Sequence, residues 1–172
     1  YEKGHRTVVF LRNNESDYNR HSGYVVIFRE SLLAHAKELG MTVIESEHYE
    51  ADSFDAQHFV STVFAHPDRP TAIINQANAS VLSQVLMALH DAGMSIPQDV
   101  SVLSCGTYFE GELMPQPITE MPVMPEELCA EAMNLLVSAI EEHTDIKGSV
   151  ELIEPALKRR GSVAEAGSGG TI

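Results

Sequence analysis

The sequence is short of positive charge. It has 11 Lys and Arg residues against 25 Asp and Glu residues, a formal net charge of -14, and a pI near 4.8. Affinity for nucleic acids rests on cations that neutralise phosphates, and anionic membrane surfaces also attract basic segments. This chain by itself is therefore not expected to bind DNA or RNA, and no membrane partner is expected.

Long apolar runs and a cysteine framework are also lacking. No run approaches the roughly 20 apolar residues of a membrane span, and no charged-then-apolar signal segment follows Tyr1. Cys105 and Cys129 lie in apolar runs without a CxxC neighbour, so we expect buried free thiols and a cytoplasmic, reducing location. The length of 172 residues and the hydrophobic content of 44% are those of one globular domain with a real core.

Signatures of catalysis are absent as well. There is no GxGxxG or GxxxxGK[ST] phosphate loop, no HExxH metal motif and no GxSxG elbow. His48 and His58 flank acids, which a solvated acidic surface explains better than a metal site. A phosphorelay receiver domain would need an acid at the end of the first or third strand, where Arg12 and Asn75 stand. We predict no catalytic residue, no metal and no cofactor.

What the chain does have is an alternation of apolar runs and helical patterns. Apolar, β-rich runs predict strands at residues 7–11, 42–44, 71–74, 100–103, 118–123 and 150–153. Apolar spacing and end signals predict helices over 25–39, from a cap at Ser53 to before Pro67, over 81–92, and over 125–142. Strands this apolar need cover on both faces, so the fold class is α/β, a doubly wound parallel sheet with helices on both faces.

Polar residues follow three of the predicted strands. Ligands of such sheets lie outside the carboxyl ends of the strands, where strand order reverses. The segments 12–20, 75–78 and 104–108 come at those ends and are rich in amides, hydroxyls, Arg and Tyr. Any one of these residues could be a turn former, but the set predicts a site that recognises a small polar molecule.

The predicted helix over residues 81–92 carries more apolar surface than a sheet needs. Its apolar residues cover more than the roughly 100° stripe that faces a sheet; they are Val81, Leu82, Val85, Leu86, Met87, Ala88, Leu89 and Ala92. The excess predicts a second partner, which is either another layer of the same chain or another subunit.

A series of motifs in fixed order resembles the LacI/GalR family of transcription regulators. They are Gly4-His-Arg-Thr-Val-Val-Phe10, Arg69-Pro-Thr-Ala-Ile73, Ala92-Gly-Met-Ser-Ile-Pro-Gln-Asp-Val-Ser-Val102, Pro117-Ile-Thr119 and Leu157-Lys-Arg-Arg-Gly-Ser162. Together they resemble the C-terminal part of that family's effector-binding domain, which has the periplasmic-binding-protein-like fold.

The resemblance implies a domain organisation. Residues 1–163 would be the C-terminal lobe, and the returning region 124–148 would pack on an N-terminal lobe that lies outside this chain. Residues 164–172 would form a mobile tail. Family members bind operator DNA through an N-terminal helix-turn-helix domain, which is also absent here, and they form homodimers partly through the helix that resembles residues 81–92.

The resemblance also nominates ligand-binding residues. Arg20 fits the family's R-x-x-G-[YF] motif, with Arg29 as a second candidate; Asn78, Gly106 and Thr107 fall where the family has its post-strand ligands. Ser16, Tyr18, Asn75 and Tyr108 stand behind them. The two acids that often bind sugar hydroxyls in the family are replaced, by Ala79 and Gly106-Thr107. That replacement favours an anionic or less hydroxylated effector over a neutral sugar.

The functional prediction is the effector-binding and dimerisation part of a cytoplasmic, repressor-type transcription regulator. Its effector would be a sugar or a related metabolite, and effector and DNA would change each other's affinity. Two alternatives stay open: a lobe of a periplasmic solute-binding protein, and a small enzyme on a doubly wound sheet.

Overall fold

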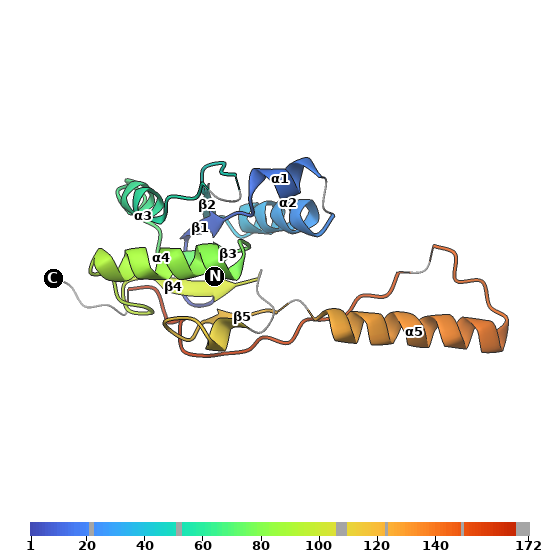
Figure 1. The fold of residues 1–172 in the computed structure, drawn as a ribbon. Coiled ribbons are helices and arrows are strands. Elements are labelled where there is room, and N and C mark those ends of the chain that lie inside the picture. Colours follow the sequence, from blue (N-terminus) through green and yellow to red (C-terminus); the bar gives the residue numbers. More distant parts are fainter. Residues whose placement is uncertain (21–22, 51–52, 106–109, 123, 149, 168–172) are drawn as a thin grey trace.

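A parallel sheet of five strands organises the part of the chain that the computed structural model describes, residues 1–20, 23–50, 53–105, 110–122, 124–148 and 150–167. The strands are β1 (Thr7–Leu11), β2 (Thr42–Glu45), β3 (Ala72–Asn75), β4 (Ser101–Ser104) and β5 (Thr119–Glu120). They lie in the order β2-β1-β3-β4-β5, and every pairing is parallel. The chain therefore reverses direction across the sheet between β1 and β3 (Figure 1).

Helices cover both faces of this sheet, because alternate side chains of each strand point to opposite faces. Helix α2 (Gly23–Glu38) lies on the face of Phe10, whose ring centroid is 5.9 Å from that of Phe28. Helices α3 (Ala56–Phe64) and α4 (Ala79–Asp91) share the other face with Val9 and Leu11. The predicted fold class, a doubly wound parallel sheet with helices on both faces, is confirmed.

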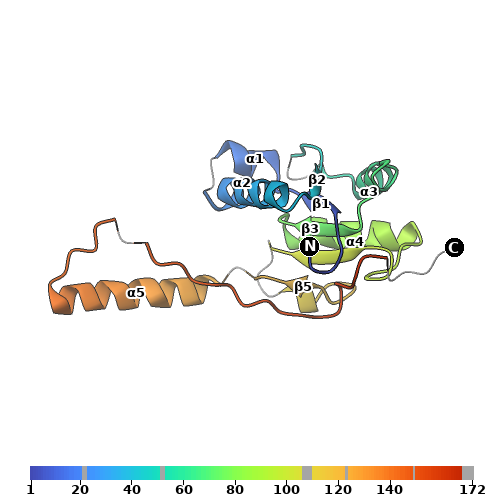
Figure 2. The same cartoon turned by 180° about the vertical axis from the view of Figure 1, so that it is seen from behind.

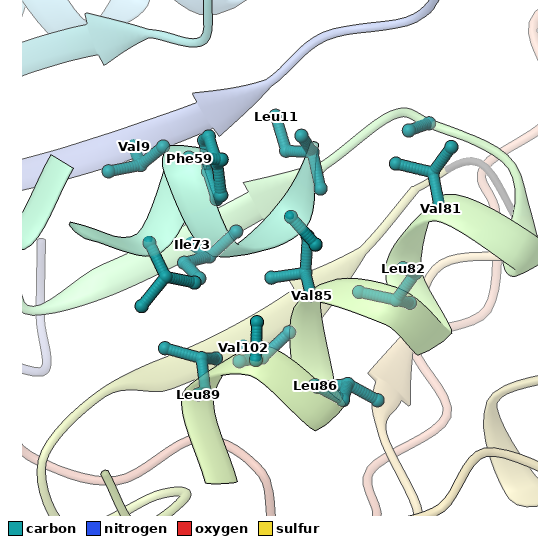
Figure 3. Close-up of a cluster of buried hydrophobic side chains, with 14 of the residues drawn as sticks. Val9, Leu11, Phe59, Ile73, Val81, Leu82, Val85, Leu86, Leu89 and Val102 are labelled. Atoms are coloured by element: carbon teal, nitrogen blue, oxygen red, sulfur yellow. The ribbon is translucent and has the colours of Figure 1, made fainter. Parts of the chain in front are cut away.

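The main core lies between the sheet and the α3–α4 layer (Figure 3). Helix α4 directs six apolar residues into it, all at most 4% exposed: Val81, Leu82, Val85, Leu86, Ala88 and Leu89. Helix α3 supplies the second layer, since it packs along α4. The extra apolar surface predicted for α4 is thus covered largely by α3 of the same chain. Met87 is the large apolar side chain of α4 that stays exposed, at 58%.

Several boundaries differ from the sequence prediction for local reasons. Asp55, not Ser53, caps α3: its Oδ1 accepts the backbone N–H of His58 at 2.9 Å. A short helix that the sequence did not predict, α1 (Glu15–Asn19), begins where Asn14 accepts the N–H of Asp17. A 3-10 turn (Glu110–Glu112) was also not predicted. Strand β5 stops before Pro122, which lacks the N–H that a ladder needs.

The predicted strand at residues 150–153 is wrong. Val150 and Leu152 are 79% and 88% exposed and belong to no strand. The contact with the sheet comes later, where the backbone of Lys158 exchanges two hydrogen bonds with Glu120, at 2.8 and 3.0 Å. Apolar composition alone did not distinguish a strand with a neighbour from an extended segment without one.

The segment after Lys158 is fastened to the edge of the sheet through a buried ion pair. Arg160 Nη1 lies 2.6 Å from Oε1 of Glu120, a side chain with no exposed surface. The other carboxylate oxygen of Glu120 accepts the N–H of Gly111 at 3.0 Å. Ser162 is also fully buried, and its hydroxyl donates to the carbonyl of Val102 at 2.6 Å. These contacts order the chain's return across β4 and β5.

The expected mobile tail begins with ordered contacts. His5, which is buried, donates from Nε2 to the carbonyl of Ala164 at 3.1 Å and accepts from the Thr71 hydroxyl at 2.8 Å. Burial lowers the pKa of His5, consistent with the neutral ring that accepts at Nδ1. The N–H of Ala166 donates to the carbonyl of Lys3. Residues 168–172 of the expected tail lie outside the described residues.

Helix α5 (Pro125–Glu142) stands apart from the sheet in both views (Figures 1 and 2). Ala139 is its one buried residue. Its exposed apolar residues, 45–63% open, are Leu128, Met133, Leu136, Val137 and Ile140.

Cys129 on α5 is exposed, which corrects the prediction of two buried thiols. Cys105 is buried, and neither cysteine forms a disulfide. No helix within the described ranges is long and apolar enough to span a membrane.

Gly111 provides a test of the buried ion pair. A Cβ at this position would lie 2.6 Å from the carbonyl oxygen of Ile118 and 2.9 Å from Arg160 Nη1. Gly111→Ala should therefore lower the free energy of unfolding by about 1–3 kcal/mol, as overpacking does, in urea denaturation. Gly23→Ala is the matched control, since its Cβ would meet nothing nearer than Ile27 Cδ1 at 4.0 Å. Equal stability of the two variants would contradict the tight packing at Gly111.

Candidate functional site

Polar side chains meet where the order of the strands reverses. Arg12 follows β1 directly, and Gln76 follows β3, its neighbour in the sheet. The N–H of Gln76 donates to the carbonyl of Leu11 at 2.9 Å, so the two strand ends are joined. This carboxyl edge is where parallel α/β sheets bind ligands. We call the side chains of Arg12, Glu15, Tyr18, His48 and Gln76 the switch-point cluster.

Arg12 lies at the centre of this cluster. It is 6% exposed, and its guanidinium carbon is 4.1 Å from the centroid of the Tyr18 ring, a cation–π contact. Its Nη2 lies 3.6 Å from the Glu15 carboxylate. Its Nε has no hydrogen-bond partner among the described residues. A guanidinium has five N–H donors and keeps its charge at any ordinary pH, so this buried cation has unused donor capacity.

His48 and Glu15 close the outer side of the cluster. The Nδ1 of His48 forms a very short hydrogen bond with the Glu15 carboxylate. Because a carboxylate only accepts, His48 donates this hydrogen bond from Nδ1. The Nη1 of Arg12 lies against the same ring, 3.0 Å from Nδ1 and 2.8 Å from Nε2. The hydrogen bond from His48 lowers the pKa of Glu15, which remains a carboxylate.

Tyr18 and Gln76 hold helix α1 against the sheet. The Tyr18 hydroxyl donates to Oε1 of Gln76 at 3.2 Å, and Nε2 of Gln76 donates to the carbonyl of Val25 at 3.2 Å. Burial raises the pKa of Tyr18, so its hydroxyl stays protonated as a donor. Tyr49 secures the other side, because its hydroxyl donates to the carbonyl of Arg12 at 2.9 Å.

The residues predicted around α1 fall at different depths. Tyr18 belongs to the switch-point cluster. Ser16 is half-buried, and its carbonyl accepts the N–H of Arg20 at 3.1 Å. Arg20 ends α1 and is exposed; its side chain makes no hydrogen bond or ion pair with a described residue. Of the two arginine candidates, Arg20 is thus the one whose charge is still available.

The remaining predicted residues have structural partners or lie outside the description. Arg29 donates two hydrogen bonds to the Glu45 carboxylate, at 2.6 and 2.7 Å. Asn78 caps α4, accepting from Val81 at 3.0 Å. Asn75 is fully buried and donates to Ala77 and Ser104, while its Oδ1 has no partner among the described residues. Gly106, Thr107 and Tyr108 lie outside the described residues.

Arg12, Glu15 and Gln76 lie in the segments where the sequence predicted the site, but they were not named as individual candidates, and His48 was not selected at all. Arg12 and His48 are 36 positions apart, and Glu15 and Gln76 come from two other segments, so the cluster exists only once the sheet has formed. The interpretation of His48 as part of a solvated acidic surface was incomplete, since it also contacts Arg12. The available signal was position: Arg12 and Gln76 are the first residues after two apolar strands.

A cavity of about 340 Å³ adjoins the cluster, between the end of β2 and helix α3. His48 lines it together with an apolar floor of Ile44, Phe54, Phe59 and Val63. Its size is within the roughly 300–1,000 Å³ range of small-molecule pockets. The site thus combines the charged switch-point cluster with an adjoining cavity that has an apolar floor.

Neither Cys105 nor Ser104, the two possible nucleophiles at the end of β4, is activated for catalysis. Burial raises the pKa of Cys105 to about 12, which keeps its sulfur a thiol and a weak nucleophile. Ser104 is fully buried, and its Oγ accepts from Asn75 at 2.9 Å. Within the described residues no group of three or more His, Cys, Asp or Glu side chains is arranged to hold a metal ion. The arrangement is suited to recognising a molecule through hydrogen bonds and charge.

Comparison with known proteins connects this geometry to a family. The profile of the periplasmic binding protein-like domain matches residues 1–163. The chain is 23% identical over 167 residues to the HTH-type transcriptional repressor PurR of Salmonella arizonae, an alignment covering 95% of this chain and 47% of the relative. It is 29% identical over 109 residues to the ribose operon repressor of Escherichia coli, covering 63% and 32%.

A solved structure gives the same result for the fold. A LacI family transcriptional regulator from Bifidobacterium animalis subsp. lactis superposes with a TM-score of 0.72 at 24% identity, over 96% of this chain and 58% of that one. The chain spans less than half the length of the two curated relatives. The predicted resemblance to the effector-binding region of LacI/GalR regulators is confirmed, and the chain belongs to the family of periplasmic binding protein-like domains.

Proposed function

We propose that this chain is the C-terminal lobe of the effector-binding domain in a LacI-type transcriptional repressor that senses a small polar molecule. The observation that carries the proposal is the family match over residues 1–163 together with two curated relatives named as repressors. The switch-point cluster supports it chemically, because it offers donors, acceptors and a cation at the ligand-binding edge of the sheet.

The effector would bind against this edge, with Arg20 and the residues after β3 and β4 as its contacts. Arg20, Asn75 and Asn78 come from the ends of β1 and β3, and Gly106, Thr107 and Tyr108 follow β4. An N-terminal lobe, outside this chain, would cover the other side of the effector. Binding between two lobes favours their closed arrangement by the difference in affinity for the two states.

Operator DNA would be bound by a separate domain of the longer protein. The net charge of -14 makes the lobe itself a poor DNA ligand. Closure of the lobes would change the placement of the DNA-binding domains in a homodimer, so that effector and operator are linked through one equilibrium. Met87 on α4 and Leu113 after the 3-10 turn are exposed apolar side chains, at 58% and 84%, and are suited to a dimer contact.

Helix α5 would be the main contact of this lobe with the N-terminal lobe. Its exposed apolar residues lie on a helix that stands clear of the sheet (Figure 2). Apolar surface of this extent is costly in water and is usually covered by a partner. Region 124–148 would therefore be the returning crossover of the two-lobed domain.

The regulator would act without catalysis and in the cytoplasm. Both curated relatives are named as transcriptional regulators, not as enzymes. The buried, protonated thiol of Cys105 and the buried hydroxyl of Ser104 do not favour a nucleophile at the site.

The function predicts reciprocal coupling in the full-length protein. A metabolite that raises the melting temperature should change operator affinity by a factor of about 5–150, and operator DNA should change the affinity for that metabolite by the same factor. Fluorescence anisotropy with operator DNA and calorimetry with the metabolite measure the two halves of this cycle. Specific DNA binding with no response to any stabilising metabolite would contradict the sensing role.

The two arginine candidates should differ in their effect on effector binding. Arg20→Ala removes an available charge, so effector affinity should fall about tenfold or more, the value of a charged hydrogen bond. Arg29→Ala should leave effector affinity within about threefold and instead lower stability, because Arg29 is paired with Glu45. Calorimetry and thermal melts separate the two effects, and a reversed order would place Arg29 in the cleft.

The proposed role of α5 predicts a stability loss in the full-length protein. Leu136→Ser should lower the free energy of unfolding by about 2 kcal/mol, because Leu136 would be buried against the N-terminal lobe. Asn134→Ser, on the opposite side of the same helix, is the control and should change it by less than about 0.5 kcal/mol. Urea denaturation measures both. No loss for Leu136→Ser would mean that α5 remains exposed in the full-length protein.

A further inference from the structure

Two arginine–carboxylate contacts beside the ends of β1 and β2 differ in their geometry. Arg29 and Glu45 form a complete fork, with two hydrogen bonds of 2.6 and 2.7 Å. Such bidentate pairing satisfies both partners. Arg12 and Glu15 are only 3.6 Å apart at their nearest atoms, which is an ion pair without a hydrogen bond. Arg12 is nevertheless the more deeply buried arginine, with a side chain 7% exposed against 35% for Arg29.

Glu15 is held away from Arg12 by another partner. Its carboxylate takes the short hydrogen bond from His48 Nδ1, and His48 is 68% exposed. The Nη1 of Arg12 contacts the same His48 ring, 3.0 Å from Nδ1 and 2.8 Å from Nε2. The buried guanidinium therefore has one imidazole partner and one carboxylate that pairs with it without a hydrogen bond, while its Nε has no acceptor among the described residues. A buried charge of this kind is costly unless an anion satisfies it.

The rest of the cluster fixes the guanidinium in place for such an anion. The Tyr18 ring covers one face of the guanidinium at 4.1 Å, and Tyr49 holds the backbone carbonyl of Arg12. Glu15 and Tyr18 lie on α1, a helix of five residues, and the Glu15 side chain is 28% exposed. The cation is thus rigid and buried, whereas the anion beside it lies on a short element at the surface and can be displaced.

We propose that Arg12 receives an oxyanion of the effector, a carboxylate or a phosphate, and that Glu15 is an internal anion which the effector displaces. This inference rests on the proposed function and deepens it, because it names the chemical class of the effector. An incoming oxyanion can accept from two N–H groups of the guanidinium at once, which the present position of Glu15 does not allow. Glu15 then keeps its hydrogen bond to His48 and turns to solvent.

The test is the effect of Glu15 on anion affinity in the full-length protein, with inorganic phosphate and acetate as separate probes in calorimetry. Glu15→Gln removes the competing charge, so affinity for the preferred probe should rise about tenfold, within the usual range of coupling between sites. The probe that gains more identifies a phosphate or a carboxylate as the group recognised.

Glu47→Gln is the matched control for net charge. Glu47 is an exposed carboxylate, 78% open, whose ion-pair partner is His58 and not Arg12. It should change the affinity for either probe less than twofold. Arg12→Lys keeps the charge but loses the fork, and should abolish the gain seen with Glu15→Gln. Thermal melts of each variant check that it folds, and Glu15→Gln, at a half-buried surface position, tests the idea even if Arg12→Lys does not fold.

The outcomes separate this inference from the proposed function. An equal response of Glu15→Gln and Glu47→Gln, or no phosphate or acetate binding in any variant, would overturn the oxyanion site. Effector and operator could still be coupled through a neutral molecule, so the repressor function would stand. A gain of affinity specific to Glu15→Gln and dependent on Arg12 is the result that the structure leads us to expect.

Discussion

Strands that all run parallel and are covered on both faces place their polar chemistry at their ends, and this constraint shapes the whole chain. The central strands β1, β3 and β4 are nearly free of exposed surface. Most of their side chains are apolar, and the buried Asn75 and Ser104 at two strand ends are hydrogen-bonded to each other. Charged and hydrogen-bonding groups therefore collect where each strand ends, and the parallel arrangement brings those ends to one edge. The site at the β1–β3 reversal is a consequence of the same rule that builds the core.

The overall charge of the chain and the local charge at the site have opposite signs. The chain as a whole is strongly acidic, with a net charge of -14. At the carboxyl edge, however, a buried guanidinium occupies the centre of the site, and exposed Arg20 adds a second positive charge at the end of α1. An acidic surface does not attract DNA, which suits a lobe whose proposed role is sensing. A local cation within that surface then gives charge selectivity to a single place.

The sequence was sufficient for the sheet, for the larger helices and for the family. Apolar runs such as that of β1 and the spacing on α4 are local patterns, and they are preserved by packing. Two features were not accessible in this way. Helix α1 is too short and polar to show a periodic stripe, and it is held by the Asn14 cap and the Tyr18 contact with Gln76. The Arg12–His48 contact joins distant segments.

The same limit explains the wrong prediction at the C-terminal end. Residues 150–153 are apolar enough for a strand, but a strand also needs a free sheet edge beside it. The edge of β5 is taken by Lys158 instead. Among the predicted site residues, Asn78 uses its Oδ1 to cap α4, and the guanidinium of Arg29 is paired with Glu45. Residue type at a strand end thus indicates a candidate, and only the partners of each side chain distinguish a structural role from an available one.

The return of the chain along β5 also covers an edge of the sheet that could otherwise pair with strands of other molecules. An open strand edge presents unpaired N–H and C=O groups, and such edges recruit strands from other molecules. Lys158 and Ser162 occupy these groups on β5 and β4, while Arg160 neutralises the carboxylate of Glu120 behind them. A chain shortened before Lys158 would leave the β5 edge unpaired and the buried carboxylate of Glu120 without its arginine partner. Protection of this edge of the sheet is in this sense a property of the returning segment 158–162 rather than of the core.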